Sequence, residues 1–200
     1  MSTLVDLLTQ QLGSNALNSM TRELGADKTQ TSAALSAAIP LLVSALARNA
    51  SDPQGAHALS KALSRDHDGS VLNNVAAALG NPQLRSDGAA ILGHVLGDRR
   101  DRVQSGLGRS TGLDPASAGQ LLQMVAPLVL GALGKMQKER GLGASDLASM
   151  LGHEQQHIQQ SAPDLRGVVG NLLDANQDGS VVDDVLRLGG TLSNLFGKKS

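Results

Sequence analysis

Apolar residues recur at helical spacing along most of this chain. Before Gly13 they fall on one helical face, which is made of Leu4, Val5, Leu7, Leu8 and Leu12. Gly13 ends this predicted helix, and Ser14 begins a second one that closes at Gly25. No segment of useful length alternates apolar and polar residues as a strand would. The pattern therefore predicts an all-α fold class.

Two segments are longer and more apolar than the rest. They cover residues 27–47 and 115–138, and each contains one proline, Pro40 or Pro127, in its most apolar part. A proline inside a helix removes a backbone donor and usually bends the helix. We predict two long proline-kinked core helices that pack against each other, with the other helices around them.

The remaining predicted helices are short and are separated by turn or capping residues. They cover residues 53–63, 71–79, 89–96, 98–107, 145–151, 163–173 and 181–195. Asp27, Asp52 and Asp114 each precede a helix as N-cap residues, and a proline at the first helical position follows two of them. The sequence thus predicts a helical bundle of about nine to eleven helices.

The two halves of the sequence resemble each other. At a shift of 87 residues, several turn, capping and helix residues coincide in type, including Gly25 with Gly112, Asp27 with Asp114, and Pro40 with Pro127. We predict two copies that share one core, residues 1–86 and residues 87–200, with one helix inserted in the second copy after Pro163. Chance similarity between helices rich in Ala and Leu is the alternative.

The composition limits how the core is built. The chain is 40% hydrophobic and 18% charged, which is typical of a globular protein, but Phe196 is its only aromatic residue. The core must therefore consist of Leu, Val, Ile, Ala and Met. A contact lined by Ala buries little apolar area, at about 25 cal/mol per Å². This composition favours modest stability per residue, or additional burial by self-association into a homo-oligomer.

Charge and residue usage argue against several partners. The net charge is −1 and there are no stacking aromatic side chains, so nucleic acid is not an expected partner. The absence of Cys excludes disulfides and thiolate metal sites.

The first residues lack the basic and apolar regions of a signal peptide, which predicts a cytoplasmic protein. The two long segments approach the ~20 residues of a membrane span, but their polar first halves predict buried core helices and no span.

Three segments together resemble a known family. They are Ala-Ile-Leu-Gly-His-Val-Leu-Gly at 90–97, the Leu-x-x-x-Ala-Pro-Leu-Val-x-Gly-x-Leu-Gly pattern that ends the string 112–134, and the Asp-Gly-Ser turn at 178–180. The chain resembles the bacterial family catalogued as domain of unknown function 937. The resemblance covers most of the chain and implies a small all-helical bacterial protein without an assigned activity. It supplies no catalytic or cofactor-binding residues.

A calcium loop is the first candidate site. Residues 174–180 match the first half of such a loop, with oxygen ligands at the odd positions and Gly179 at the turn. The candidate ligands are Asp174, Asn176, Asp178, Ser180, Asp183 and Asp184. Val185 occupies the position of the usual bidentate Glu, so Asp183 or Asp184 would have to substitute. The weaker earlier copy has Ser64, Asp66, Asp68, Asn73 and Asn74.

Helix capping explains the same residues more simply. Asp178 and Gly179 make a turn, Ser180 caps the next helix, and Asp183 completes a capping box near the positive helix end. This alternative needs no metal, and the sequence favours it over calcium binding.

A zinc motif is the second candidate. His153, Glu154 and His157 fit the His-Glu-x-x-His pattern, in which two imidazoles on one helical face bind zinc and the Glu activates water. Both variable positions are Gln, however, and no Glu or His beyond these residues offers a third ligand. The sequence favours an exposed polar helix end over a catalytic site.

Other motifs give weaker indications of function. His94 lies in an apolar segment, which predicts a core or interface histidine, and residues 98–102 alternate in charge like a solvated helix face. No phosphate loop or nucleophile elbow is present. The leading prediction is a non-enzymatic bacterial helical protein that acts by self-assembly or protein–protein interaction. The alternatives are a calcium-responsive structural protein and, as the weakest, a zinc hydrolase.

Overall fold

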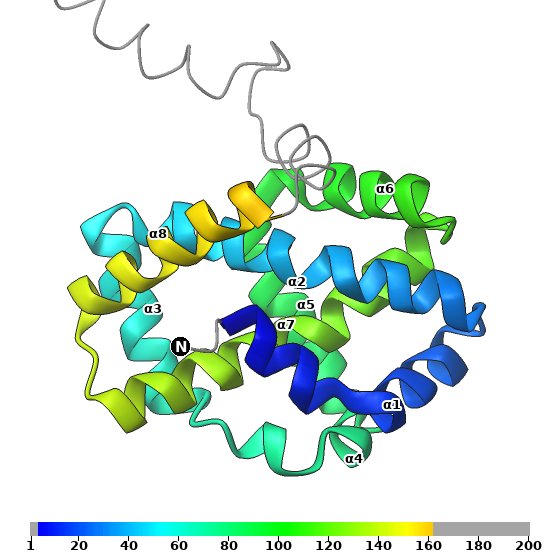
Figure 1. Ribbon diagram of the computed structural model, residues 1–200, viewed down its shortest axis with the longest axis horizontal. Helices are drawn as coiled ribbons and strands as arrows, with labels where there is room; N and C mark the ends of the chain where they lie inside the picture. Colours follow the sequence, from blue (N-terminus) through cyan, green and yellow to red (C-terminus); the bar gives the residue numbers. More distant parts are fainter. Residues whose placement is uncertain (1–3, 162–200) are drawn as a thin grey trace, which may run out of the picture.

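The computed structural model describes residues 4–161, and every regular element in this part of the chain is a helix (Figure 1). The predicted all-α class is therefore confirmed. The helices are α1 (Leu4–Leu24), α2 (Lys28–Ala50), α3 (Pro53–Asp66), η1 (Ser70–Asn74), α4 (Val75–Leu79), α5 (Pro82–Leu96), η2 (Gly97–Arg99), α6 (Arg100–Thr111), α7 (Pro115–Arg140) and α8 (Ala144–Ser161), where η marks a 3-10 helix.

Helix α1 contains the break that its sequence predicts. Gly13 has φ 28° and ψ 179°, which is not helical, so two helical stretches meet there. A positive φ of this kind favours glycine, which has no Cβ to clash with the backbone. The buried residues on both sides of the break face the core and are Leu4, Leu8, Leu12, Ala16 and Met20.

The N-caps of the two long helices also follow from sequence. The Asp27 carboxylate accepts from the Thr29 backbone N–H at 2.6 Å, and Asp114 accepts from Ala116 and Ser117 at 2.9 and 3.0 Å. These bonds lower both aspartate pKa values, with the largest effect from the Thr29 backbone for Asp27 and from the Ser117 side chain for Asp114. Because the folded pKa is depressed, this stabilisation is present above about pH 4 and is lost as the pH falls further.

Helices α2 and α7 form the core and pack against each other, as predicted. Pro40 and Pro127 lie inside them, and the helix continues on both sides of each proline; a bend at these positions stays a prediction. Both helices are long and apolar enough to cross a membrane, but 72% and 78% of their most apolar windows are buried in the fold. Such burial is typical of core helices, and the expected absence of a span stays a prediction.

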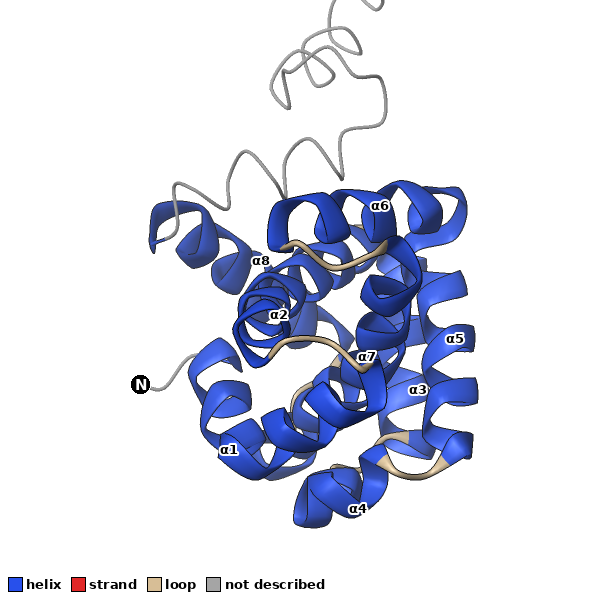
Figure 2. Ribbon diagram, turned by 90° about the vertical axis from the view of Figure 1, so that its right-hand side faces the viewer, coloured by secondary structure: helices blue, strands red, loops and turns tan. Residues whose placement is uncertain are grey.

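Helix α7 has the most central position. It packs against α1, α2, α3, α5 and α6, and Figure 2 shows it between α2 on one side and α5 on the other. Its buried Gln137 connects it to α3, because the side-chain amide donates to Ser60 Oγ at 2.7 Å and its oxygen accepts from Ser64 Oγ at 3.3 Å. The amide is thus buried with its hydrogen-bonding groups satisfied.

Two glycines allow backbones to approach α7 closely. A Cβ added to Gly88 of α5 would collide with the carbonyl of Gln123, and one added to Gly134 of α7 would collide with the carbonyl of His67. In a core without aromatic side chains, small residues let helices bury backbone and short side chains directly. These two contacts fix how α5 and the end of α3 lie on α7.

Three helix starts differ from the prediction. Helix α5 begins at Pro82 rather than at residue 89, because Asn81 caps it by accepting from the Gln83 N–H. The helix predicted over 71–79 is divided into η1 and α4, with Asn74 as the cap of α4. Helix α8 begins at Ala144, one residue before the predicted range 145–151. These local choices are close in free energy, so tertiary contacts can shift a start by a few residues.

The duplication and the number of helices are not confirmed. Gly25 and Gly112 both have positive φ, and Asp27 and Asp114 both cap long helices that contain proline, which agrees with two related copies. Residues 162–200 of the later copy, including the helices predicted at 163–173 and 181–195, lie outside the described residues. The division into 1–86 and 87–200 therefore stays a prediction.

Substitution of Gly88 tests the close contact between α5 and α7. We expect Gly88→Ala to lower the free energy of unfolding by about 1–3 kcal/mol, because the added methyl group overlaps the Gln123 carbonyl. Gly93→Ala is the matched control on the same helix, since nothing lies within 4 Å of its added Cβ. Urea unfolding measures both. Equal stability of the two variants would contradict the close approach.

Candidate functional site

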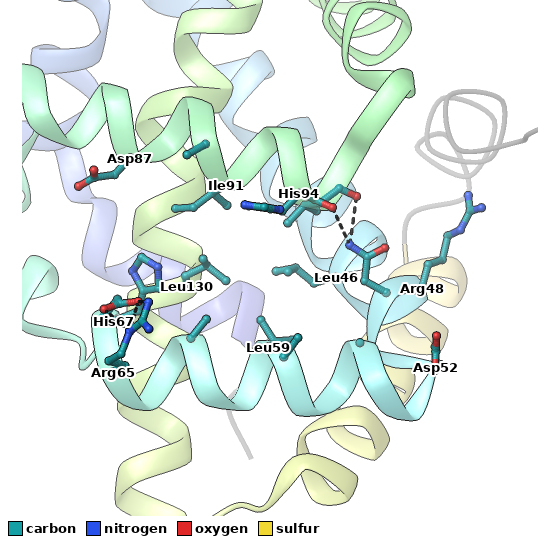
Figure 3. Close-up of a pocket in the computed structure, with 17 residues that line it drawn as sticks. Leu46, Arg48, Asp52, Leu59, Arg65, His67, Asp87, Ile91, His94 and Leu130 are labelled. Carbon is teal, nitrogen blue, oxygen red and sulfur yellow. Dashed lines mark hydrogen bonds and ion pairs between the residues drawn. The ribbon is translucent and has the colours of Figure 1, made fainter.

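An apolar groove between α3 and α5 is the main candidate site in the described part of the chain. Both helices pack against α2 and α7, and a space of about 1000 Å³ is left between them (Figure 3). The two walls run in opposite directions: α3 passes from Asp52 to Arg65, while α5 passes from Asp87 to His94 alongside it. A groove of this kind is a default site for a ligand or a partner segment.

The floor and walls of the groove are apolar. Leu46 of α2 and Leu130 of α7 form the floor, and both are buried. Leu59 and Ile91 line the two walls and are only half-buried. The other wall positions are mostly small and recur at helical spacing, namely Gly55, Ala58 and Ala62 on α3 and Ala90 on α5. Because these side chains are short, they cannot fill the space between the helices.

Polar side chains lie at both ends of the groove. At one end Asn49 of α2 donates to the carbonyls of Val95 and His94, at 3.2 and 3.5 Å, and so connects α2 to α5 (Figure 3). Arg48 and Asp52 line the same end.

At the other end of the groove, Arg65 and Asp66 form an exposed ion pair at 2.8 Å. His67 and Asp87 lie beside this pair (Figure 3). The groove therefore has an apolar centre and charged ends.

His67 is a titratable group at this end of the groove. Burial lowers the pKa of its imidazole, and the negative charges of Asp66 and Asp87 oppose this effect. The neutral form of His67 is therefore favoured at neutral pH. A neutral imidazole costs less to cover than a charged one, so the groove can accept an apolar occupant at this end.

The structure gives the zinc motif a different local role. His153 and His157 are exposed, while Glu154 accepts from the Leu4 backbone N–H at 3.1 Å through Oε1. Glu154 thus supplies a cap to the first turn of α1 from another helix. Its Oε2 is buried and meets no donor among the described residues. Within residues 4–161 no group of three or more His, Asp or Glu side chains is placed to hold a metal ion.

The predicted calcium ligands are not described by the structure. Asp174, Asn176, Asp178, Ser180, Asp183 and Asp184 lie outside the described residues, so the calcium loop stays a prediction. Within the earlier copy, the side chains take part in local bonds. Asp66 pairs with Arg65, Asp68 accepts from Ser70 N–H at 2.9 Å, and Asn74 accepts from Ala77 N–H at 3.1 Å.

Two further interpretations can be compared with the structure. His94 is exposed at the rim of the groove, so the core alternative was wrong, while the interface alternative stays a prediction; α5 turns Leu92, Val95 and Leu96 inward instead. Asp98, Asp101 and Arg102 are exposed, as expected for a solvated face. The groove itself was missed, because its walls come from helices that are not consecutive. The only sequence signal was the repeated small residues on α3.

One comparison with known proteins identifies the family. A family model described as bacterial protein of unknown function (DUF937) matches residues 6–136. The chain belongs to this family. The resemblance seen in the sequence is thereby confirmed. Every residue that lines the groove lies inside the DUF937 match, whereas residues 153–157 and 174–184 lie beyond it. Comparison with curated proteins and with solved structures finds no match.

The capping role of Glu154 makes a prediction about stability. We expect Glu154→Ala to lower the free energy of unfolding by about 1 kcal/mol, because the first turn of α1 loses an acceptor. Glu154→Gln keeps a side-chain oxygen and should lose less. Glu139→Ala, at an exposed position, is the control. Stoichiometric zinc in protein purified without a tag, lost on His153→Ala or His157→Ala, would contradict this role.

Calcium binding at residues 174–184 is tested separately. If capping alone explains this loop, calorimetric titration with millimolar Ca²⁺ should give no heat, because the loop lacks a bidentate Glu. Heat that disappears in Asp178→Ala but persists in Asp68→Ala would establish the later loop as a calcium site.

Proposed function

We propose that this protein is a non-enzymatic helical module that self-assembles, and that the groove between α3 and α5 receives a helix from a second copy. The observation that carries this proposal is the groove itself, with its apolar floor of Leu46 and Leu130 and its half-exposed Leu59 and Ile91. Binding of an amphipathic helix in an apolar groove is a common mode of protein recognition.

The dimensions of the groove suit a helix. Its walls are 14 and 15 residues long, which corresponds to about 21–22 Å at 1.5 Å per residue. The small side chains at Gly55, Ala58, Ala62 and Ala90 allow the backbone of an incoming helix to approach closely. Close packing compensates for the small apolar area that each such contact buries.

The polar groups of the groove support a binding role more than a catalytic one. Asp52 accepts from the Gln54 N–H at 3.0 Å, Asp66 is bonded to Arg65, and Asp87 accepts from the Gln83 side chain at 2.8 Å. Each carboxylate is therefore engaged in local structure. A general acid or base needs to reach a substrate proton, and these bonds direct the carboxylates to groups of their own helices.

The composition favours a second copy as the partner. The core lacks aromatic side chains, and contacts lined by Ala and Gly bury little area each. Covering Leu59 and Ile91 would add apolar burial that residues 4–161 do not achieve by themselves. A partner with the same sequence satisfies this need without any other protein.

The test is the dependence of molar mass on concentration, measured by size-exclusion chromatography with light scattering. We expect a homo-oligomer that Ala58→Glu or Ala90→Glu weakens about tenfold or more in Kd, because each places a charge on a groove wall. Both alanines are exposed, so the variants should keep their fold. The matched control is Ala33→Glu, at an exposed position of α2 outside the groove.

Two results would contradict the proposal. The first is a monomer at every concentration up to the highest soluble one. The second is an oligomer that all three Glu variants leave unchanged, because assembly would then use another surface. Melting temperatures of the variants show whether a lost oligomer reflects lost folding.

A further inference from the structure

The C-terminal part of the sequence contains an apolar stripe of five residues, which lies beyond the residues that the structure describes. Val181, Val185, Leu188, Leu192 and Leu195 are spaced four, three, four and three residues apart. This spacing places all five on one face of the helix predicted over 181–195. A helix with such a face must bury it against another element, because exposed apolar stripes favour association.

We infer that residues 181–195 of one copy occupy the groove between α3 and α5 of another. This inference rests on the proposed function, since it names the helix that self-assembly places in the groove. The exchange joins the C-terminal segment of one chain to a site on the next, so each copy both donates a helix and receives one.

Length is the first supporting observation. The predicted helix 181–195 would extend about 22 Å, at 1.5 Å per residue. The walls α3 and α5 have 14 and 15 residues, and are therefore about as long. Five apolar side chains spaced along this length can meet Leu46, Leu59, Ile91 and Leu130 in turn.

Charge is the second observation, and it sets the direction of the helix. The segment carries Asp183 and Asp184 near its start, and Lys198 and Lys199 just after it. In the groove, the end at Asn49 and His94 opens into a pocket of about 470 Å³. Three arginines, Arg48, Arg99 and Arg102, outnumber Asp52 and Asp98 around this end.

The opposite end of the groove has Arg65, Asp66 and Asp87, and because Arg65 pairs with Asp66, Asp87 supplies the excess negative charge. The acidic start of the segment therefore fits the arginine-rich end, and its lysines fit the aspartate end. This arrangement makes the incoming helix parallel to α3 and antiparallel to α5. Charges placed in this way fix the direction of binding more than they add affinity.

Reach is the third observation, and it allows a second copy as the partner. The described residues end at Ser161 of α8, which packs against α2 and α3. Residues 162–180 can extend roughly 60 Å, which is ample to reach a neighbouring molecule. The choice of a second copy over the same chain rests on the proposed self-assembly, and the cross-linking experiment below distinguishes the two.

Disulfide trapping tests the inference in the full-length protein, which has no natural Cys. Ile91→Cys and Leu188→Cys are made in separate chains and mixed under mild oxidation. We expect a covalent heterodimer on a non-reducing gel, because a disulfide needs Cα atoms within about 7 Å. Val185→Cys and Leu192→Cys repeat the test one turn away on each side. The control, Ala33→Cys mixed with Leu188→Cys, should not cross-link.

The outcomes separate this inference from the proposed function. If no Cys pair reacts and Leu188→Glu leaves the oligomer intact while Ala90→Glu disrupts it, the groove mediates assembly but residues 181–195 are not its occupant. If Ile91→Cys and Leu188→Cys react only when both are in one chain, the exchange between copies is overturned. If Leu188→Glu and Ala90→Glu both weaken the oligomer and Ser193→Glu does not, the inference is supported.

Discussion

The close contact between α7 and its neighbours is the constraint on which the fold depends. A core with no aromatic side chains in its described part has to gain its stability from many short side chains packed tightly together. Gly88 and Gly134 make this possible, because each lies where a Cβ would collide with a carbonyl of the adjoining segment. The helices can therefore bury backbone against backbone, and α7 contacts most of the other helices at once.

The short side chains that allow this close packing also produce the groove. Helices α3 and α5 each pack their buried faces against α2 and α7. Many of the positions at which α3 and α5 face each other are occupied by glycine or alanine. Short side chains help helices to pack closely in the core. Between α3 and α5, where no other described helix packs, the same short side chains leave a space. Leu59 and Ile91 then stay half-exposed above an apolar floor. The groove that we propose for self-assembly therefore follows from the way the core is built.

Local motifs were less informative than this packing. The His-Glu-x-x-His pattern predicts zinc only if both imidazoles and the carboxylate face a shared, enclosed site. In the fold, Glu154 turns to the start of α1 while the two histidines are exposed. At the earlier Asp-Gly-Ser turn, Asp68 and Asn74 likewise accept from the backbone N–H groups of Ser70 and Ala77. Hydrogen-bond donors at helix starts attract carboxylates, and this competes directly with metal binding.

The sequence alone determined the helical class, the two buried long helices, the break at Gly13, and the caps at Asp27 and Asp114. These features depend on periodicity and on backbone chemistry within a few residues, so they can be recognised without a fold. Only the tertiary structure decided the exposure of His94, the role of Glu154 and the groove between α3 and α5. Each of these depends on which distant helices meet, and local propensity does not encode that information.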